Sequence, residues 1–451
     1  MKRPCVPFVS IVPVLIPLVL IMNLVSMPSL AAAQAYSVTN IGKASTRPSP
    51  RAVDNNGDVA GVFVVPTKPP QSHAFLYTKT GGIQDLGTLG GSGNDSAAFG
   101  INTSGQVVGQ ANSSASGSDQ AFLWTKTPGM IDLGNLGGPS SVANAINVSG
   151  QVAGQSDLES GFTAAFLWSQ SGGMQNLGTL SGGQQSGANA INSAGEIAGW
   201  ANVGSNDDAI IWTESGGMVN LGINASCGAT ALGLNDSGEV VGWFNNSAGC
   251  SFTSHGFSWT HNGGLKDLGV LSGGQFTFAY GINSTGQIVG SGDSSTSAIV
   301  AVLWTADGTI HDLNTLIARG TARTLVAANA INNAGQIVAD ATAKTGKGNY
   351  ALLLTPIMST ALASSLNPSV SGQAVTITAT VSSIAGPPPN GEQIVFKQGT
   401  TVLATVPLTG GAASFTTSSF TVGEHKIVAT YAGDAIYASS KSLILTQVVD
   451  K

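Results

Sequence analysis

A short turn signal of the form Asn-x-x-Gly returns along this chain at nearly constant intervals, and it constrains the fold more than any other feature. The first of its seven copies reads Asp54-Asn55-Asn56-Gly57, and the copies end at Gly57, Gly105, Gly150, Gly195, Gly238, Gly286 and Gly335. Subtracting successive residue numbers gives intervals of 48, 45, 45, 43, 48 and 49 residues. A period in this range marks an array of one repeated supersecondary unit.

Four short runs typical of β-strands fill each unit. In the second unit they are residues 98–102, 106–109, 121–125 and 130–134, each bounded by Gly, Asn or Ser. Asn and Gly at the two ends of the signal suit a type I turn, so we expect the first two strands to form a tight hairpin. A second hairpin joins the third and fourth strands through turns such as residues 79–82.

Length variation among the units is confined to two connections. The residue that opens the third strand and the polar residue near the end of the fourth are always 11 apart, as Ala74 and Asp85 are. The connection between the second and third strands varies, and so does the connection between units. Because alternate connections of an antiparallel meander lie at the same end, the variable loops share one face and the tight turns occupy the other.

Four-stranded units repeated radially give a β-propeller. The last unit ends with a third strand, residues 351–355, that no fourth strand follows, whereas residues 36–42 match the fourth-strand pattern. Pairing of these two segments would close a ring and remove exposed sheet edges. We therefore predict an all-β chain with a seven-bladed propeller of four-stranded blades over residues 36–356. A β-solenoid is the alternative, but it does not explain why the two ends complete one unit.

The repeats resemble the bacterial extracellular repeats of the HAF family, named for a His-Ala-Phe tripeptide. The tripeptide stands literally at residues 73–75 and loosely at residues 255–257, and the likeness extends through residues 85–91 and 101–109. It implies an exported repeat protein and brings no established activity or catalytic residue. Several units lack the histidine, because they have Gln120, Ala164 or Asp208 in its place.

The pattern changes after Pro356, and residues 357–451 predict a second domain. Alternating apolar runs such as residues 374–381 and 426–431, separated by turns such as residues 387–391, favour a β-sandwich. The stretch from Ala429 to Asp434 resembles a bacterial Ig-like domain. That resemblance implies a spacer or an adhesive module.

The first 35 residues predict a secretory signal peptide. Lys2 and Arg3 precede an apolar stretch over residues 6–27, and residues 33–35 form an A-x-A cleavage pattern. An uncleaved membrane anchor is the alternative, since the apolar run approaches spanning length. We expect no transmembrane segment in the mature chain, and a secreted or cell-surface location, with the periplasm as a further option.

Composition narrows the class of partner. Only 9% of the residues are charged and the net charge is −6, which argues against nucleic acid as a partner, because nucleic-acid binding needs a basic face.

Cys227 and Cys250 follow the signal segment and would form a disulfide in an oxidising compartment. The histidines have no metal-ligand spacing, and no nucleophile elbow or phosphate loop is present. We predict no metal and no cofactor.

Two tryptophans break the repeat and mark a candidate binding site. Trp200 and Trp243 directly follow the glycine of the second strand, where other units have Gln110, Gln155 or Ser291. They belong to adjacent units, so we expect them to lie near each other beside a variable loop, with Phe244, Asp207 and Asp208 close by. Such aromatics stack on sugar rings or anchor a protein. The alternative is that both tryptophans pack between blades.

These observations favour an exported, non-enzymatic protein that binds a glycan or a cell-surface protein through the variable-loop face. A carbohydrate-active hydrolase or lyase is the first alternative, with an acid and a base drawn from Asp157, Glu159, Asp207 and Glu214. A structural component of an envelope or matrix is the second alternative.

Overall fold

The computed structural model describes residues 34–42, 46–91, 93–223, 227–245, 253–296, 298–318, 321–344, 348–434 and 436–451. Throughout these ranges the chain is all-β, and its one helical element is the short 3-10 helix η2 (Leu313–Thr315). Nearly all of the predicted signal peptide therefore lies outside the described residues. No helix in the described part is long and apolar enough to span a membrane.

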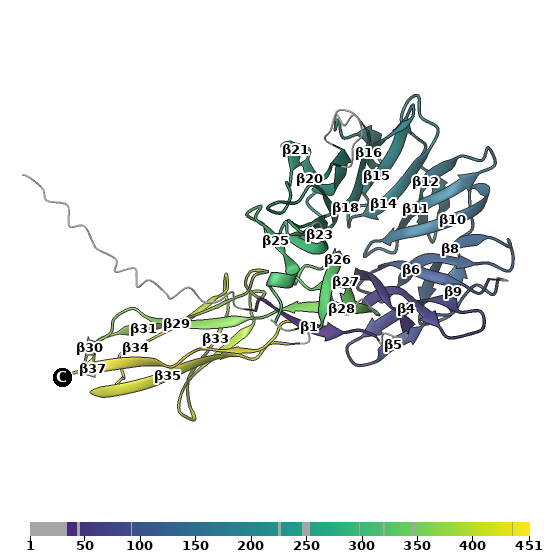
Figure 1. The fold of residues 1–451 in the computed structure, drawn as a ribbon. Coiled ribbons are helices and arrows are strands. Elements are labelled where there is room, and N and C mark those ends of the chain that lie inside the picture. Colours follow the sequence, from purple (N-terminus) through teal and green to yellow (C-terminus); the bar gives the residue numbers. More distant parts are fainter. Residues whose placement is uncertain are drawn as a thin grey trace, which may run out of the picture. The chain divides into compact units, whose positions relative to one another are not determined.

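Seven four-stranded antiparallel sheets form from the described residues between Tyr36 and Pro356. Six of them consist of four consecutive strands (Figure 1). The first three are β2 (Ser49–Val53), β3 (Val59–Val65), β4 (Gln71–Thr78), β5 (Gly82–Asp85); β6 (Ser96–Ile101), β7 (Val107–Asn112), β8 (Asp119–Thr125), β9 (Gly129–Asp132); and β10 (Gly137–Ile146), β11 (Val152–Leu158), β12 (Thr163–Ser169), β13 (Gly173–Asn176). The next three are β14 (Ser186–Ile191), β15 (Ile197–Val203), β16 (Asn206–Thr213), β17 (Gly217–Asn220); β18 (Ala229–Leu234), β19 (Val240–Asn245), β20 (Ser254–Thr260), β21 (Gly264–Asp267); and β22 (Thr277–Ile282), β23 (Ile288–Asp293), β24 (Ile299–Trp304), β25 (Ile310–Asp312).

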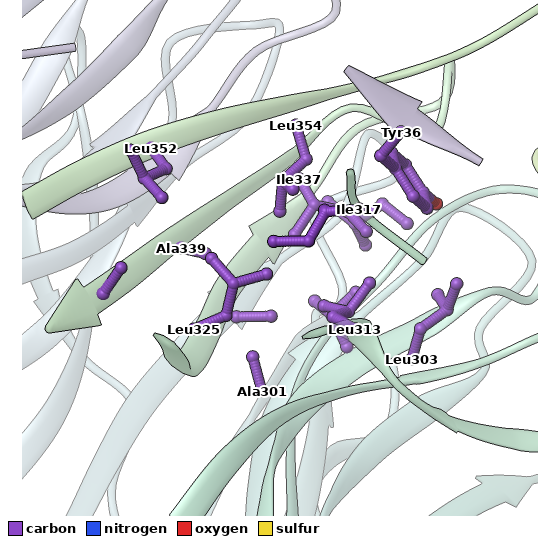
Figure 2. Close-up of a cluster of buried hydrophobic side chains, with 14 residues drawn as sticks. Tyr36, Ala301, Leu303, Leu313, Ile317, Leu325, Ile337, Ala339, Leu352 and Leu354 are labelled. Carbon is purple, nitrogen blue, oxygen red and sulfur yellow. The ribbon is translucent and has the colours of Figure 1, made fainter. Parts of the chain in front are cut away.

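The remaining sheet joins strands from the two ends of the array. It contains β26 (Arg323–Ile331), β27 (Ile337–Ala343), β28 (Asn349–Pro356) and β1 (Tyr36–Asn40). Strand β1 runs antiparallel to β28, which is the pairing expected from the sequence. The Tyr36 side chain is fully buried and packs with Leu354 and other aliphatic residues of this sheet and its neighbour (Figure 2).

The first strands of the sheets contact one another in a closed circle. Each of β2, β6, β10, β14, β18, β22 and β26 touches the first strand of the next sheet, and β26 touches β2. The circle places the first strands innermost, which is the arrangement of a β-propeller. Every first strand also carries a register shift at the same position, such as that between Ala98 and Gly100, and a bulge of this kind bends the strand locally.

Buried apolar side chains fill the spaces between successive sheets. Phe75, Phe122, Phe166 and Phe257 of the third strands are fully buried. Hydroxyl groups add a link from each such strand to the next sheet. Ser186, for example, accepts a hydrogen bond from the Ala165 amide at 2.9 Å and donates one to the Gly178 carbonyl at 2.6 Å. Equivalent links are made by Ser96, Ser141 and Thr277.

The C-terminal residues form two further sheets around a separate core. One sheet has the order β29-β31-β34 and the other β30-β37-β35-β32-β33, with β36 paired to β35. The core includes Ile377, Phe396 and Ile427, as expected of a β-sandwich. The bounds are β29 (Ser359–Ser364), β30 (Ser369–Val370), β31 (Val375–Ser382), β32 (Gln393–Gln398), β33 (Thr401–Pro407), β34 (Ala412–Thr417), β35 (Gly423–Tyr431), β36 (Ser440–Lys441) and β37 (Leu445–Asp450).

Candidate functional site

The Asn-x-x-Gly turns meet in a ring of hydrogen bonds, here called the asparagine ring. The first asparagine of one turn donates its side-chain amide to the backbone carbonyl of the same position in the next turn. Asn102 reaches Asn147 at 2.9 Å, for example, and Asn147 reaches Asn192 at 3.1 Å. Further links of 2.8 to 3.3 Å are made by Asn192, Asn235, Asn283 and Asn332. The ring fixes how the seven turns sit against one another.

A cavity of about 240 Å³ lies within the asparagine ring, and all seven sheets contribute to its wall. The lining pairs a buried or half-buried aliphatic residue from each first strand with an exposed residue from each turn. The aliphatic residues are Val53, Ile101, Ile146, Ile191, Leu234, Ile282 and Ile331, and the turn residues are Asn55, Thr103, Val148, Ser193, Asp236, Ser284 and Asn333. Several of the turn residues hydrogen-bond to one another, as the Ser193 amide does to Asp236 at 2.9 Å.

An aromatic cluster joins two neighbouring sheets at the other end of the strands. Trp243 lies on β19 three residues beyond Val240, away from the tight turn that precedes that strand. Its ring meets Phe278 of β22 at 5.8 Å between centroids and 71°, an edge-to-face contact. Phe278 also contacts Phe276 at 5.7 Å and Tyr280 at 6.5 Å. All four rings are half-buried, so part of each is available to a ligand.

Trp200 occupies the same register position on β15 as Trp243 does on β19, and it is also half-buried. Its indole nitrogen lies over Gly187, close to the side chain of Gln155 in the preceding sheet. Among the described residues no ring contact links Trp200 with Trp243, whose partner is Phe278. The two tryptophans therefore have different neighbours although they share a position in the repeat.

The other predicted site residues have separate environments. Phe244 is only 8% exposed and packs on Phe257 at 6.4 Å between ring centroids. It is an interior residue, because the strand alternation that exposes Trp243 turns its neighbour inward. Asp207 is exposed as a residue, but its carboxyl group is partly shielded from solvent. This shielding, and then the charge of Asp208, raise the pKa of the carboxyl. Asp208 accepts a hydrogen bond from the Asn220 side chain at 2.8 Å.

The carboxylates considered for catalysis do not all share one end of the fold. Asp207 is the second residue of β16, while Glu214 follows the last residue of that strand. Seven residues of extended chain separate them by about 23 Å, whereas the paired carboxylates of glycosidases lie about 5 to 10 Å apart. Asp157 is half-buried and accepts a hydrogen bond from Thr163 at 3.2 Å, and Glu159 is exposed.

The sequence predicted a disulfide between Cys227 and Cys250 and no metal site. Cys227 is disulfide-bonded, but Cys250 lies outside the described residues, so the pairing of these two stays a prediction. Among the described residues no group of three or more His, Cys, Asp or Glu side chains is placed to hold a metal ion. His73 contacts both carboxylate oxygens of Asp85 at 2.9 Å, and that carboxylate also accepts from the Gly87 amide. This histidine thus ties the third strand to the end of the fourth.

Phe276, Phe278 and Tyr280 were not identified from the sequence. Their spacing of two residues puts them on one side of an extended strand, and this was the available signal. No other first strand has three aromatic residues in this pattern. Only the fold shows that this strand borders the one carrying Trp243.

Comparison with known proteins gives a family match for the C-terminal domain. Residues 362–450 match the model of the family described as bacterial Ig-like domain (group 3). No curated protein matches the chain. Among solved structures, the chain is similar to the β-propeller domain of the Trilobed protease from Pyrococcus furiosus, with 10% identity and a TM-score of 0.46. That comparison covers 71% of this chain and 97% of the other.

A second solved structure similar to the chain is the extracellular domain of a protein described as a hybrid two-component system from B. thetaiotaomicron. The identity is 10% and the TM-score is 0.37, over 92% of this chain and 59% of the other. The sheet topology and the family match together define an all-β protein in which a β-propeller precedes a bacterial Ig-like domain.

Proposed function

We propose that this chain is an exported, non-enzymatic binding protein that holds a glycan at the variable-loop face of a seven-bladed propeller. In this proposal residues 1–35 are a signal peptide, residues 36–356 are the propeller built from HAF-type repeats, and residues 357–451 are the Ig-like module. The ligand-binding surface is the aromatic cluster of Trp243, Phe276, Phe278 and Tyr280, extended by Trp200.

The edge-to-face contact between Trp243 and Phe278 is the observation that carries the proposal. An aromatic face carries partial negative charge and attracts the weakly positive C–H groups of a sugar ring. Hydroxyl groups border the cluster, since the hydroxyl oxygens of Tyr280 and Ser291 lie 2.7 Å apart. Half-buried rings beside polar groups suit a ligand with one apolar side and many hydroxyls. A cell-surface protein is the other ligand class that exposed aromatics serve.

The alternative of a hydrolase or lyase needs two carboxylates within one cleft. The separation of Asp207 and Glu214 along β16 removes one of its possible pairs. The aromatic cluster supports binding instead, because it departs from the repeat at several positions that meet in space.

A glycan array probed with the purified chain tests the proposal. Trp243→Ala and Phe278→Ala should each weaken binding of the retained glycan by about tenfold, equivalent to about 1.4 kcal/mol. The double variant Trp200→Ala/Trp243→Ala should abolish it. Trp168→Ala is the matched control, because Trp168 is also half-buried but lies in the third strand of another sheet.

Thermal unfolding of each variant separates loss of the site from loss of the fold. Glycan binding that survives both single substitutions in folded protein would overturn the site. Capture of a cell-surface protein that depends on Trp243, with no glycan retained, would overturn the ligand class and keep the surface.

A further inference from the structure

One junction of the asparagine ring differs from the other six. Six turns begin with asparagine, and each donates to the carbonyl of the next turn. The first turn begins with Asp54, which is 4% exposed. Its Oδ1 accepts from the amides of Asn56 and Asp58 at 2.9 Å, as Asn102 Oδ1 accepts from its own turn. Asp54 Oδ2 therefore occupies the position at which each of the other turns has a side-chain NH2 group that donates a hydrogen bond.

An ionised carboxylate has no hydrogen to donate, so Asp54 cannot make the link to Asn102 that every other turn makes. Asn56 compensates in part. Its side-chain amide donates to Asp54 Oδ2 at 3.1 Å and to the Thr103 carbonyl at 2.9 Å. The junction between the first and second turns is thus held by a different and more exposed contact.

The residue four positions on is also different in the first turn, because its side chain is shorter than in any other turn. Asn102 and Asn147 donate to Gln106 and Gln151 at 2.8 Å, and the first turn has Asp58 at this position. The long side chain at this position in the other turns also reaches the glycine of the next turn. No atom of the described residues, in contrast, lies within 4 Å of where a Cβ on Gly105 would be. Four of the other turns pair the asparagine with glutamine, and two pair it with Glu196 or Glu239. The first turn alone has two carboxylates, and the shorter Asp58 leaves space at this junction.

We propose that the junction between the first two turns is proton-dependent, and that one proton taken up by the Asp54–Asp58 pair strengthens the closure of the ring. A protonated carboxyl carries one O–H donor. It can serve the neighbouring carboxylate or the Asn102 carbonyl, as the asparagine amide does elsewhere. Neutralising one group also removes the repulsion between the two charges.

Among the described residues, neither carboxylate forms a salt bridge. Burial raises the pKa of Asp54. Burial and then the charge of Asp54 raise the pKa of Asp58 to about 6. The adjoining turns present uncharged groups, Asn102, Thr103 and Gln336, to this part of the ring. Strand β4 contributes Tyr77, which pairs with Val59, and Lys79 follows that strand. Arg51 on β2 acts on Asp340 instead.

The direction of the effect follows from linkage. Between about pH 4 and pH 6 the folded chain binds more protons at this pair than the unfolded chain does, so stability contributed here falls as the pH rises. The contribution is complete below the ordinary pKa of an aspartate and is lost once the pH passes the raised value of Asp58. Wild-type protein should therefore be less stable at pH 7.5 than the same ring with an amide at this junction.

Thermal unfolding followed by tryptophan fluorescence tests this directly, because all seven tryptophans lie between residues 124 and 304 and report on the propeller. Asp54→Asn/Asp58→Gln recreates the asparagine–glutamine pair that four of the other turns have. It should raise the midpoint at pH 7.5 by a few degrees and reduce the gain that the wild type shows on acidification to pH 5. Asp236→Asn is the matched control in the same ring, at a junction that an asparagine already closes.

Three results would contradict the proposal. A double variant with the wild-type midpoint at pH 7.5 and the wild-type pH profile would overturn the proposal. An equal change in Asp236→Asn would attribute the effect to net charge and would also overturn it. The unfolding midpoint of the wild type is also measured with calcium chloride added at pH 7.5. Calcium that raises the wild-type midpoint to that of the double variant would mean that the pair takes a cation instead of a proton.

Discussion

Asn332 donates its side-chain amide to the backbone carbonyl of Asp54 at 2.8 Å, although 278 residues separate them in the chain. The same pair of turns is joined again by the Asn333 amide and the Asn55 side chain at 2.9 Å. The last and first turns of the array are therefore linked by the bonds that link consecutive turns elsewhere. Ring closure rests on these contacts as well as on the pairing of β1 with β28.

We expect Tyr36 to stabilise the fold through its apolar ring and to destabilise it through its hydroxyl group. Its side chain is fully buried, its hydroxyl has no hydrogen-bond partner among the described residues, and burial raises its pKa. Tyr36→Phe removes an unsatisfied polar group and should raise the free energy of unfolding by about 1 kcal/mol. Tyr36→Ala should lower it by about 3 to 5 kcal/mol. Urea unfolding of both variants measures the pair, and a destabilised Tyr36→Phe would show that the hydroxyl does have a partner.

Ser186 should contribute through its hydroxyl alone. Replacing it with alanine leaves the Ala165 amide and the Gly178 carbonyl without this buried partner, and we expect a loss of about 1 to 3 kcal/mol. Ser186→Thr should be tolerated better, because Thr277 makes the equivalent bonds. Ser193→Ala, at an exposed turn, is the control. Equal stability of Ser186→Ala and Ser193→Ala in denaturant would contradict the prediction.

Asn147→Asp should introduce a second proton-dependent junction. It removes the donor to Gln151 at 2.8 Å and to the Asn192 carbonyl at 3.1 Å. We expect a loss of about 2 to 3 kcal/mol at pH 7.5, recovered in part at pH 5 as the new carboxyl protonates. The sign follows because an aspartate buried among acceptors binds protons more tightly folded than unfolded. Fluorescence-detected unfolding at the two pH values checks it, and a pH-independent loss would count against it.

Gly154 should not tolerate a side chain. A Cβ at this position would lie 2.0 Å from the Val142 carbonyl oxygen, so the backbone of β10 would have to shift. Gly154→Ala should lower the free energy of unfolding by about 3 kcal/mol, at the upper end of the usual cost of overpacking. Gly161→Ala is a suitable comparison, because its Cβ would meet no atom of the described residues and only its positive φ opposes the change. Melting temperatures of the two variants test the ranking.

The repeat period predicted the strand pattern well, because four short strands bounded by turn residues leave a regular trace in the sequence. The pairing of β1 with β28 also followed from the pattern, since each end lacked what the other supplied. The spacing could not predict the bulge in each first strand. In β10 the shift follows Ala143, which pairs with Gly154, next to the point where the Val142 carbonyl approaches Gly154.

The candidate site was only partly predictable. Trp200 and Trp243 stood out because they break the repeat, but Phe244 next to Trp243 faces the interior. The sequence indicates which positions depart from the pattern, and it does not say which side of a strand each one takes at a sheet edge. Phe278 entered the site only through its contact with Trp243 across two sheets.

The sequence alone determined the strand units, their spacing and the change of pattern after Pro356, because turn chemistry and alternation are local properties of the chain. The tertiary structure alone decided which residues from distant units meet. Asp54 illustrates the difference. In the sequence it is an ordinary turn residue. Only the closed ring places its carboxylate at the position from which an asparagine amide donates in each of the other six turns, so that burial raises the pKa of this carboxyl.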